Sequence, residues 1–294
     1  MKAGKFARIV VLAVGMLAAM GLYVWKATEW SRGFQPFLVH GQGSPGGPHE
    51  TFIDPIIPTI MVGSFDGGAT KFATVIQITS TGSTTAFVSG TFFNSDGTAF
   101  PATFRTNQSG LPTFNATFQT VSLPVGSTLA IVADQDVPLL GWGSISVSSN
   151  SRMGTGNVAV TTFLENRNAV TGEVKFRLPV DSTSAGMASF LLQRFSDPAS
   201  TDVGFFIVNN SSTTADITAT FRKADGMIIA TRSLQLRPFN QIAYFVPDFF
   251  SLPPESPGRN YTNIVFDSNS TLLSAVALGS GAGPYVTYPV VRLR

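Results

Sequence analysis

The chain contains no cysteine, two histidines and few charged residues, and each shortage excludes a class of chemistry. Without cysteine there can be no disulfide, thiolate nucleophile, Cys-ligated zinc, iron–sulfur centre or lipid anchor on a processed cysteine. Charged residues make up only 12% of the 294 residues, about half the usual share. The net charge of +2 creates no strong field that would gather nucleic acid.

Both histidines, His40 and His49, lie in a stretch rich in glycine and proline that has no apolar periodicity. Such a stretch is predicted to be a spacer outside the folded domains. A Ser-His-Asp or Cys-His arrangement built within the domains is therefore excluded, as are metal sites that use imidazole. We expect no enzymatic activity, no bound cofactor and no metal.

The N-terminus has the pattern of an export signal. Lys2, Lys5 and Arg8 precede an uncharged apolar run over residues 9–25. We expect residues 1–30 to be a signal peptide or signal anchor, and residues 31–56 to be the Gly/Pro-rich spacer. As a helix the run would reach about 25 Å, against a bilayer core of about 30 Å. Cleavage and retention both stay open, and residues 9–25 are the only expected membrane contact if the signal is uncleaved.

The rest of the sequence is typical of an all-β protein. Short runs of Val, Ile, Phe and Thr alternate with clusters of Gly, Asn, Asp, Ser and Pro, and no long window keeps a helical apolar period. Evenly spaced short strands of this kind favour an antiparallel sandwich of immunoglobulin-like or jelly-roll-like type.

The sequence also repeats itself. Residues 76–86 align without gaps to residues 205–215, and the same offset of 129 carries Asp96-Gly97 onto Asp225-Gly226. Two further blocks match in the same order, at offsets of 113 and 119, which we interpret as length differences in loops. We therefore predict two tandem antiparallel β-sandwich domains, over residues 57–173 and 174–294, the second a repeat of the first.

Four features together resemble a family of uncharacterised exported bacterial proteins, common in acidobacteria, with tandem β-sandwich units. These features are the lead-in from Ile57-Pro58 through Gly67-Gly68 to Val75, the hairpin at residues 90–97, the Leu123-Pro124 strand leading to Gly141-Trp142-Gly143, and the closing Tyr288-Pro289-Val290. The resemblance covers roughly residues 57–290 and implies export and the sandwich fold. It assigns no catalytic residue. The second unit departs from the pattern, having Asn260-Tyr261-Thr262 near the place of Gly-Trp-Gly.

Two places in the sequence are candidate binding sites. Asp134 and Asp136 form the nearest carboxylate cluster, but they lack the further ligands and the turn glycine of a calcium loop, and we interpret them as part of a polar loop. Trp142 is the only tryptophan available to a domain, since Trp25 and Trp30 precede both. Its ring is either packed in a core or domain junction, which we favour, or a platform that stacks on a sugar.

Taken together, these patterns predict a non-catalytic exported protein of the cell surface, the envelope, the periplasm or the extracellular space. Its expected role is structural, adhesive or scaffolding, and its expected partner is a protein or polysaccharide of the envelope or matrix. A pair of carbohydrate-binding modules is the first alternative. A secreted glycoside hydrolase is the second, although past the spacer the only glutamates, Glu165, Glu173 and Glu255, stand beside turn residues.

Overall fold

The structure is a computed structural model that describes residues 55–64, 70–149, 157–184, 186–196, 203–252, 260–280 and 285–293. The predicted export signal, and all of the predicted spacer except its last two residues, lie outside these ranges. No helix among the described residues is long and apolar enough to cross a membrane. The described chain is almost entirely antiparallel β-structure, which confirms the predicted all-β class.

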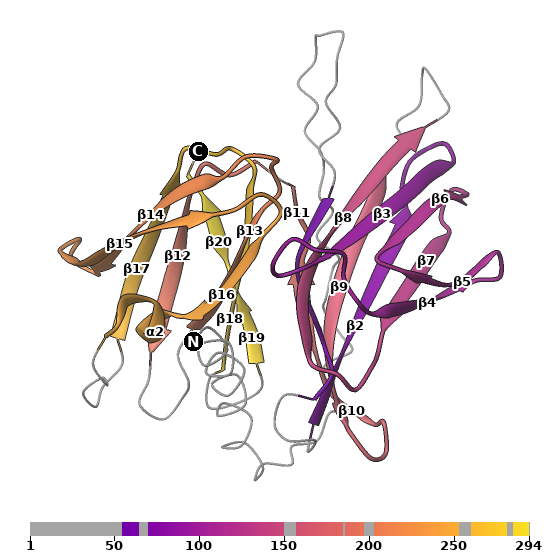
Figure 1. The fold of residues 1–294 in the computed structure, drawn as a ribbon, viewed down its shortest axis with the longest axis horizontal. Coiled ribbons are helices and arrows are strands. Elements are labelled where there is room, and N and C mark those ends of the chain that lie inside the picture. The colour runs from indigo at the N-terminus through magenta and orange to yellow at the C-terminus, as the bar shows by residue number, and fades with distance from the viewer. Residues whose placement is uncertain are drawn as a thin grey trace, which may run out of the picture.

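The N-terminal half forms two sheets that face each other (Figure 1). The first sheet has the order β11 (Thr183–Ser184), β1 (Pro55–Val62), β8 (Leu139–Ser149), β3 (Ala86–Asn94) and β6 (Thr117–Leu123). The second has the order β10 (Val174–Asp181), β9 (Val158–Asn168), β2 (Thr70–Ser80), β7 (Thr128–Ala133), β4 (Thr103–Gln108) and β5 (Leu111–Asn115). Strands β3 and β7 alternate buried and half-buried side chains, as expected where one face of a sheet meets a core. Ile76, Phe92 and Ile131 are among the residues of that core.

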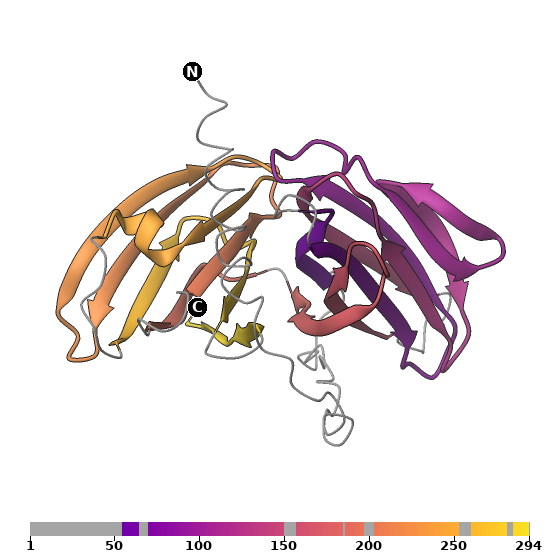
Figure 2. The ribbon, with the colours of Figure 1, turned by 90° about the horizontal axis from the view of Figure 1, so that it is seen from below.

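The C-terminal half is built the same way around a separate core (Figure 2). One sheet has the order β15 (Ile228–Leu236), β14 (Ala215–Lys223), β17 (Asn260–Ser268), β12 (Ser189–Ser196) and β20 (Val290–Arg292). The other has the order β16 (Gln241–Phe245), β13 (Val203–Asn209), β18 (Leu273–Ser280) and β19 (Tyr285–Tyr288), and a short helix, α2 (Val246–Phe250), follows β16.

The strand order of the first half recurs in the second. The order β1-β8-β3-β6 corresponds to β12-β17-β14-β15, and the order β10-β9-β2-β7 corresponds to β19-β18-β13-β16. The self-similar segments of the sequence fall on corresponding strands, because residues 76–86 join β2 to β3 and residues 205–215 join β13 to β14. Both Asp-Gly pairs form turns after β3 and β14, and Gly97 and Gly226 have the positive φ that such turns require.

The largest length difference between the halves is a hairpin and not a loop, so that detail of the sequence interpretation was wrong. Ile76 and Phe205 are 129 residues apart, but Leu123 and Leu236 are 113 apart, so the first half has 16 more residues in between. Strands β4 and β5 account for them. Phe104 of β4 stacks on Phe92 with ring centroids 4.4 Å apart.

The second half uses α2 in place of this hairpin. Phe221, which corresponds to Phe92, stacks on Phe250 of the helix at 5.2 Å. Phe249 of the helix is buried and meets Phe205 edge to face at 5.3 Å. Two unrelated local structures thus supply the aromatic side chains that complete equivalent cores.

The sheets also place the division between the halves differently from the predicted boundary at residues 173/174. Strand β10 pairs with β9, and β11 pairs with β1, so the sheets of the first half run on to Ser184. The turn at Thr171-Gly172, which the sequence suggested as a boundary, is the tip of the β9–β10 hairpin; Gly172 there has a φ of +71°.

Candidate functional site

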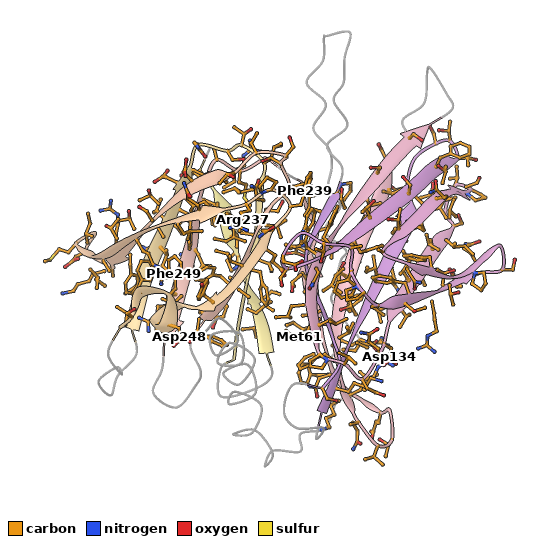
Figure 3. The ribbon with its side chains drawn as sticks, viewed as in Figure 1. Met61, Asp134, Arg237, Phe239, Asp248 and Phe249 are labelled. Carbon is orange, nitrogen blue, oxygen red and sulfur yellow. The ribbon has the colours of Figure 1, made fainter. Side chains whose placement is uncertain are left out.

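The region where the two halves meet is the most distinctive site of the described chain. The outer face of the β16-β13-β18-β19 sheet carries Phe206, Val276 and Leu278, which pack with Leu178 and Leu140 of the first half. All seven residues of β13 are buried, because this sheet has a core on one face and the junction on the other. Figure 3 shows Met61 and Phe239 along this contact.

Trp142 lies at the centre of a second part of the junction. Its side chain is 0% exposed and packs with Ile56 of its own half and Val208 of the other. The indole Nε1 donates a hydrogen bond to the carbonyl oxygen of Phe239, 2.9 Å away. The ring also stacks on Phe93, with centroids 4.4 Å apart. The structure therefore places Trp142 in the junction, where its faces are covered and cannot stack on a sugar.

The two glycines beside Trp142 face the core of the first half. Strand β8 alternates, so Trp142 points toward the junction while Gly141 and Gly143 point into the sandwich. A Cβ at Gly143 would lie 2.5 Å from the Phe92 ring, and one at Gly141 would lie 2.6 Å from the Phe100 ring. Neither glycine has a positive φ. The residues are small because aromatic rings and, at Gly141, the backbone carbonyl oxygen of Phe93 lie close against the strand, and not because the strand must bend there.

Gln241 fastens the two halves with polar contacts. Its Nε2 donates to the carbonyl oxygens of Pro58, at 2.7 Å, and Gly141, at 3.0 Å, both in the first half. Its backbone N–H donates to Ser95 O at 2.9 Å. The turn at Gly97 also lies against the chain around Asn240. Because the Gln241 side chain is only 5% exposed, these bonds are shielded from water.

Replacing Gln241 with alanine should destabilise the protein by about 1–3 kcal/mol, because two buried carbonyl oxygens would lose their donor. Gln235, an exposed glutamine on β15, offers the matched control, and Gln235→Ala should have a much smaller effect. Chemical denaturation of the two variants measures the difference. Equal effects would show that the junction bonds contribute no more than a surface contact.

The equivalent face of the first half is polar, unlike the face of the second half that forms the junction. Strand pairing places Gln77 and Thr161 where the second half has Phe206 and Val276. Thr79 likewise stands in the place of Val208. A face with these side chains gains little from burial against another apolar surface. The first half therefore does not offer this face for packing against a further unit, as is typical of the terminal unit of a repeat protein.

A network of charged side chains covers one end of this polar face. Asp134 forms ion pairs with Lys71 and Arg167, each at 2.6 Å, and it lies away from the junction in Figure 3. Glu165, whose side chain is 3% exposed, accepts hydrogen bonds from Arg167 and Arg177. Buried carboxylates of this kind are stable only when paired, and these are paired within the chain.

The network includes Asp134 and Asp136, the two carboxylates nearest to a calcium-loop pattern in the sequence. The Lys71 ammonium group contacts Asp134 at 2.6 Å and Asp136 at 3.0 Å, so a protein cation already lies between them. Among the described residues, no group of three or more His, Asp or Glu side chains is placed to hold a metal ion. The carboxylates of Asp134 and Asp136 are thus paired with cations of the chain itself.

We expect a chelator to leave the melting temperature unchanged. An ion bound to the folded state alone would raise that temperature, so its removal by EDTA would lower it. Thermal unfolding with and without EDTA, with magnesium- or calcium-loaded EDTA as the control, measures the effect. A fall of several degrees in free EDTA only would return Asp134 and Asp136 to consideration as ligands.

Lys71 should make stability depend on alkaline pH. Its hydrogen bond to Asp134 raises the pKa of Lys71 above its ordinary value of 10.5, against the opposing effect of burial. A raised pKa contributes stability that is fully present below the unfolded value and is lost as pH rises through the folded value. The Lys71→Met variant should therefore lose less stability than the wild type when the pH rises above 10.5. Melting temperatures at pH 9 and 11 test this, with Lys175→Met, at an exposed position of β10, as the control. Equal losses of stability between these two pH values in the wild type and both variants would contradict the prediction.

The other residues considered for chemistry do not assemble into a site within the described chain. Glu165 is paired with two arginines, and Glu173 is exposed in the β9–β10 turn, just before β10 begins. Glu255, His40 and His49 lie outside the described residues. The junction residues Gln241 and Phe239 were missed by the sequence reasoning, because neither belongs to a motif.

No protein-family model, curated protein or solved structure matches this chain.

Proposed function

We propose that the protein is a non-catalytic exported protein of the cell surface or envelope, in which two tandem β-sandwich domains act as one rigid structural, adhesive or scaffolding unit. The observation that carries the proposal is the junction. Domains joined by a small polar contact move relative to each other by default, whereas a large apolar contact holds them fixed. Here the contact buries Trp142 completely and adds hydrogen bonds from its indole and from Gln241.

The sequence supports the export part of the proposal. A basic segment followed by the apolar run 9–25 has the order of an export signal. The low charge and abundant Ser, Thr and Asn fit exposed sheet faces of exported β-proteins. The family resemblance also implies export.

The carbohydrate-binding alternative has less support. It required an exposed aromatic platform, and the one indole available to the domains is covered by both halves. Among the described residues, the large hydrophobic side chains with the highest exposure are aliphatic and include no aromatic ring. Sugar binding by stacking would need such a ring.

Fractionation of a Gram-negative bacterium that expresses the full chain tests the export proposal. The wild-type chain should leave the cytoplasm, whereas Leu17→Arg, which places a charge within the apolar run, should be retained there. Arg237→Ala, at an exposed position of the second half, controls for expression of a single-site variant. A wild-type chain that stays in the cytoplasm would refute export.

The role of the exported protein is tested separately. Affinity capture from native envelope, together with a glycan array, should identify an envelope protein or polysaccharide bound without being altered. Turnover of a captured polysaccharide into shorter products would refute the non-catalytic assignment.

A further inference from the structure

Phe239 has a backbone conformation that phenylalanine rarely adopts. Its φ is +57°, in the left-handed region, where the Cβ atom of a bulky residue crowds the neighbouring backbone. The residue stands third in the turn 237–240 between β15 and β16, which is closed by a hydrogen bond from Asn240 N to Arg237 O at 3.2 Å. A positive φ at the third place of such a turn normally calls for glycine.

The corresponding turn of the first half shows what the turn itself needs. The offset of 113 between the halves places Gly126 at the position of Phe239. Gly126 has a φ of +77°, and its turn is closed by the equivalent hydrogen bond, from Ser127 N to Pro124 O at 2.9 Å. The first half thus forms the same turn with the residue that adopts a positive φ without strain. The turn alone gives no reason for a phenylalanine.

The two turns differ in their surroundings. Around the first, Val125 is 57% exposed, and a Cβ atom added to Gly126 would meet no other atom within 4 Å. The second lies where the two halves meet, and the Gly97 turn of the first half packs against residues 238–240 (Figure 3). Of the two turns, the one with the strained residue is therefore the one in the junction.

Phe239 makes two directional contacts across the junction. Its ring stacks on Phe93, with centroids 5.6 Å apart and planes 10° from parallel. Its carbonyl oxygen accepts the hydrogen bond from the Trp142 indole. Phe93 and Trp142 are neighbours on paired strands and stack on each other, so one residue of the second half engages both. Ring stacking and hydrogen bonds depend on angle as well as distance.

We propose that Phe239 is the positioning residue of the junction, a latch that fixes the orientation of the second half on the first. Apolar contact is non-directional, so it would tolerate sliding of one half on the other. Any such movement would break both the stack on Phe93 and the hydrogen bond from Trp142, with nothing left to offset the strain. Strained residues persist where the surrounding contacts hold them. The latch rests on the proposed rigid unit and names the residue that sets its geometry.

Two variants separate the strain from the contacts. Phe239→Gly removes both the ring and the strain, whereas Phe239→Ala removes the ring but keeps a Cβ atom at a positive φ. The glycine variant should therefore have the higher melting temperature, the reverse of the order expected where φ is unstrained. An alanine variant that melts at the same temperature as the glycine variant, or higher, would overturn the strain at Phe239.

The orientation of the halves can be measured as a distance between two spin labels, because the chain has no cysteine of its own. Gln77→Cys and Thr218→Cys place the labels at exposed positions of β2 and β14, one in each half. Double electron–electron resonance of the labelled full-length chain should give one narrow distance distribution. Either Phe239 variant should broaden this distribution or add a second distance.

Gly126→Ala is the matched control, since it introduces the strain in the equivalent turn away from the junction. It should lower the melting temperature and leave the distance distribution narrow. If both Phe239 variants keep a distribution as narrow as that of the wild type, the latch is wrong and the rigid unit stands. A broad distribution in the wild type would instead refute the rigid unit, and the latch with it.

Discussion

Replacing Trp142 with alanine should lower the free energy of unfolding by about 3–5 kcal/mol, the cost of removing a large aromatic side chain from a packed interior. The side chain is completely buried between Ile56, Val208 and Phe93, so neither half can fill the space alone. The carbonyl oxygen of Phe239 would also lose its indole donor. Urea denaturation followed by circular dichroism gives the change in free energy.

Two further measurements separate the parts of this effect. Trp142→Phe keeps an aromatic ring against Phe93 but removes the Nε1 donor, so it should cost less than the alanine variant and leave Phe239 O unpaired. In Trp142→Ala, moreover, the two halves should unfold in separate steps, because each retains its own core while the contact between them is weakened. A stability close to that of the wild type would contradict the packing role of the ring.

The strands and hairpins were predictable because their signals are local. Alternating apolar residues define strands such as β3, and the pairs Asp96-Gly97 and Asp225-Gly226 supply the positive φ that their turns need. The correspondence between the halves was also visible in the sequence, since residues 76–86 and 205–215 occupy the same kind of strand connection. Local chemistry and repetition therefore predicted much of the all-β fold.

The junction between the halves could not be predicted from the alternation of apolar and polar residues alone. Strand β13 is a nearly continuous apolar run from Val203 to Val208, and such a run is typical of a strand buried on both faces. Its contrast with Gln77 and Thr79 in the matching strand β2 could have shown that the second half presents an extra buried face. Which surface covers it could not be predicted from the run, because the partners come from β1, β8 and β10, which are separate strands of the first half.

The domain boundary predicted at residues 173/174 differs from the division of the sheets for a related reason. A Thr-Gly pair has the same local preference in a hairpin as in a linker, so Thr171-Gly172 could not distinguish the two. What decides is whether the next strand returns to the same sheet, and β10 does so along its whole length beside β9. The 16-residue β4–β5 insertion was likewise hidden, because two short strands with polar turns resemble a loop when no partner strand is known.

Gly141→Ala should destabilise the protein by about 3 kcal/mol, at the upper part of the range for adding a methyl group to a well-packed interior. The added Cβ would lie 2.2 Å from the carbonyl oxygen of Phe93, which belongs to the neighbouring strand β3, and 2.6 Å from the Phe100 ring. A ring can turn aside, but the carbonyl is fixed by the sheet, so relief requires β8 and β3 to move apart. Because β8 also holds Trp142, that movement would disturb the junction as well.

The matched control is Gly110→Ala in the turn between β4 and β5. Gly110 has no atom within 4 Å of an added Cβ and is not among the glycines with positive φ, so its replacement should change stability by less than about 0.5 kcal/mol. Thermal and urea unfolding of both variants give the comparison. In Gly141→Ala the fluorescence of the tryptophans should also shift to longer wavelength, because a displaced β8 admits water to the indole of Trp142. If Gly141→Ala is as stable as Gly110→Ala, the close packing of Phe93 and Phe100 against β8 cannot be what requires glycine beside Trp142.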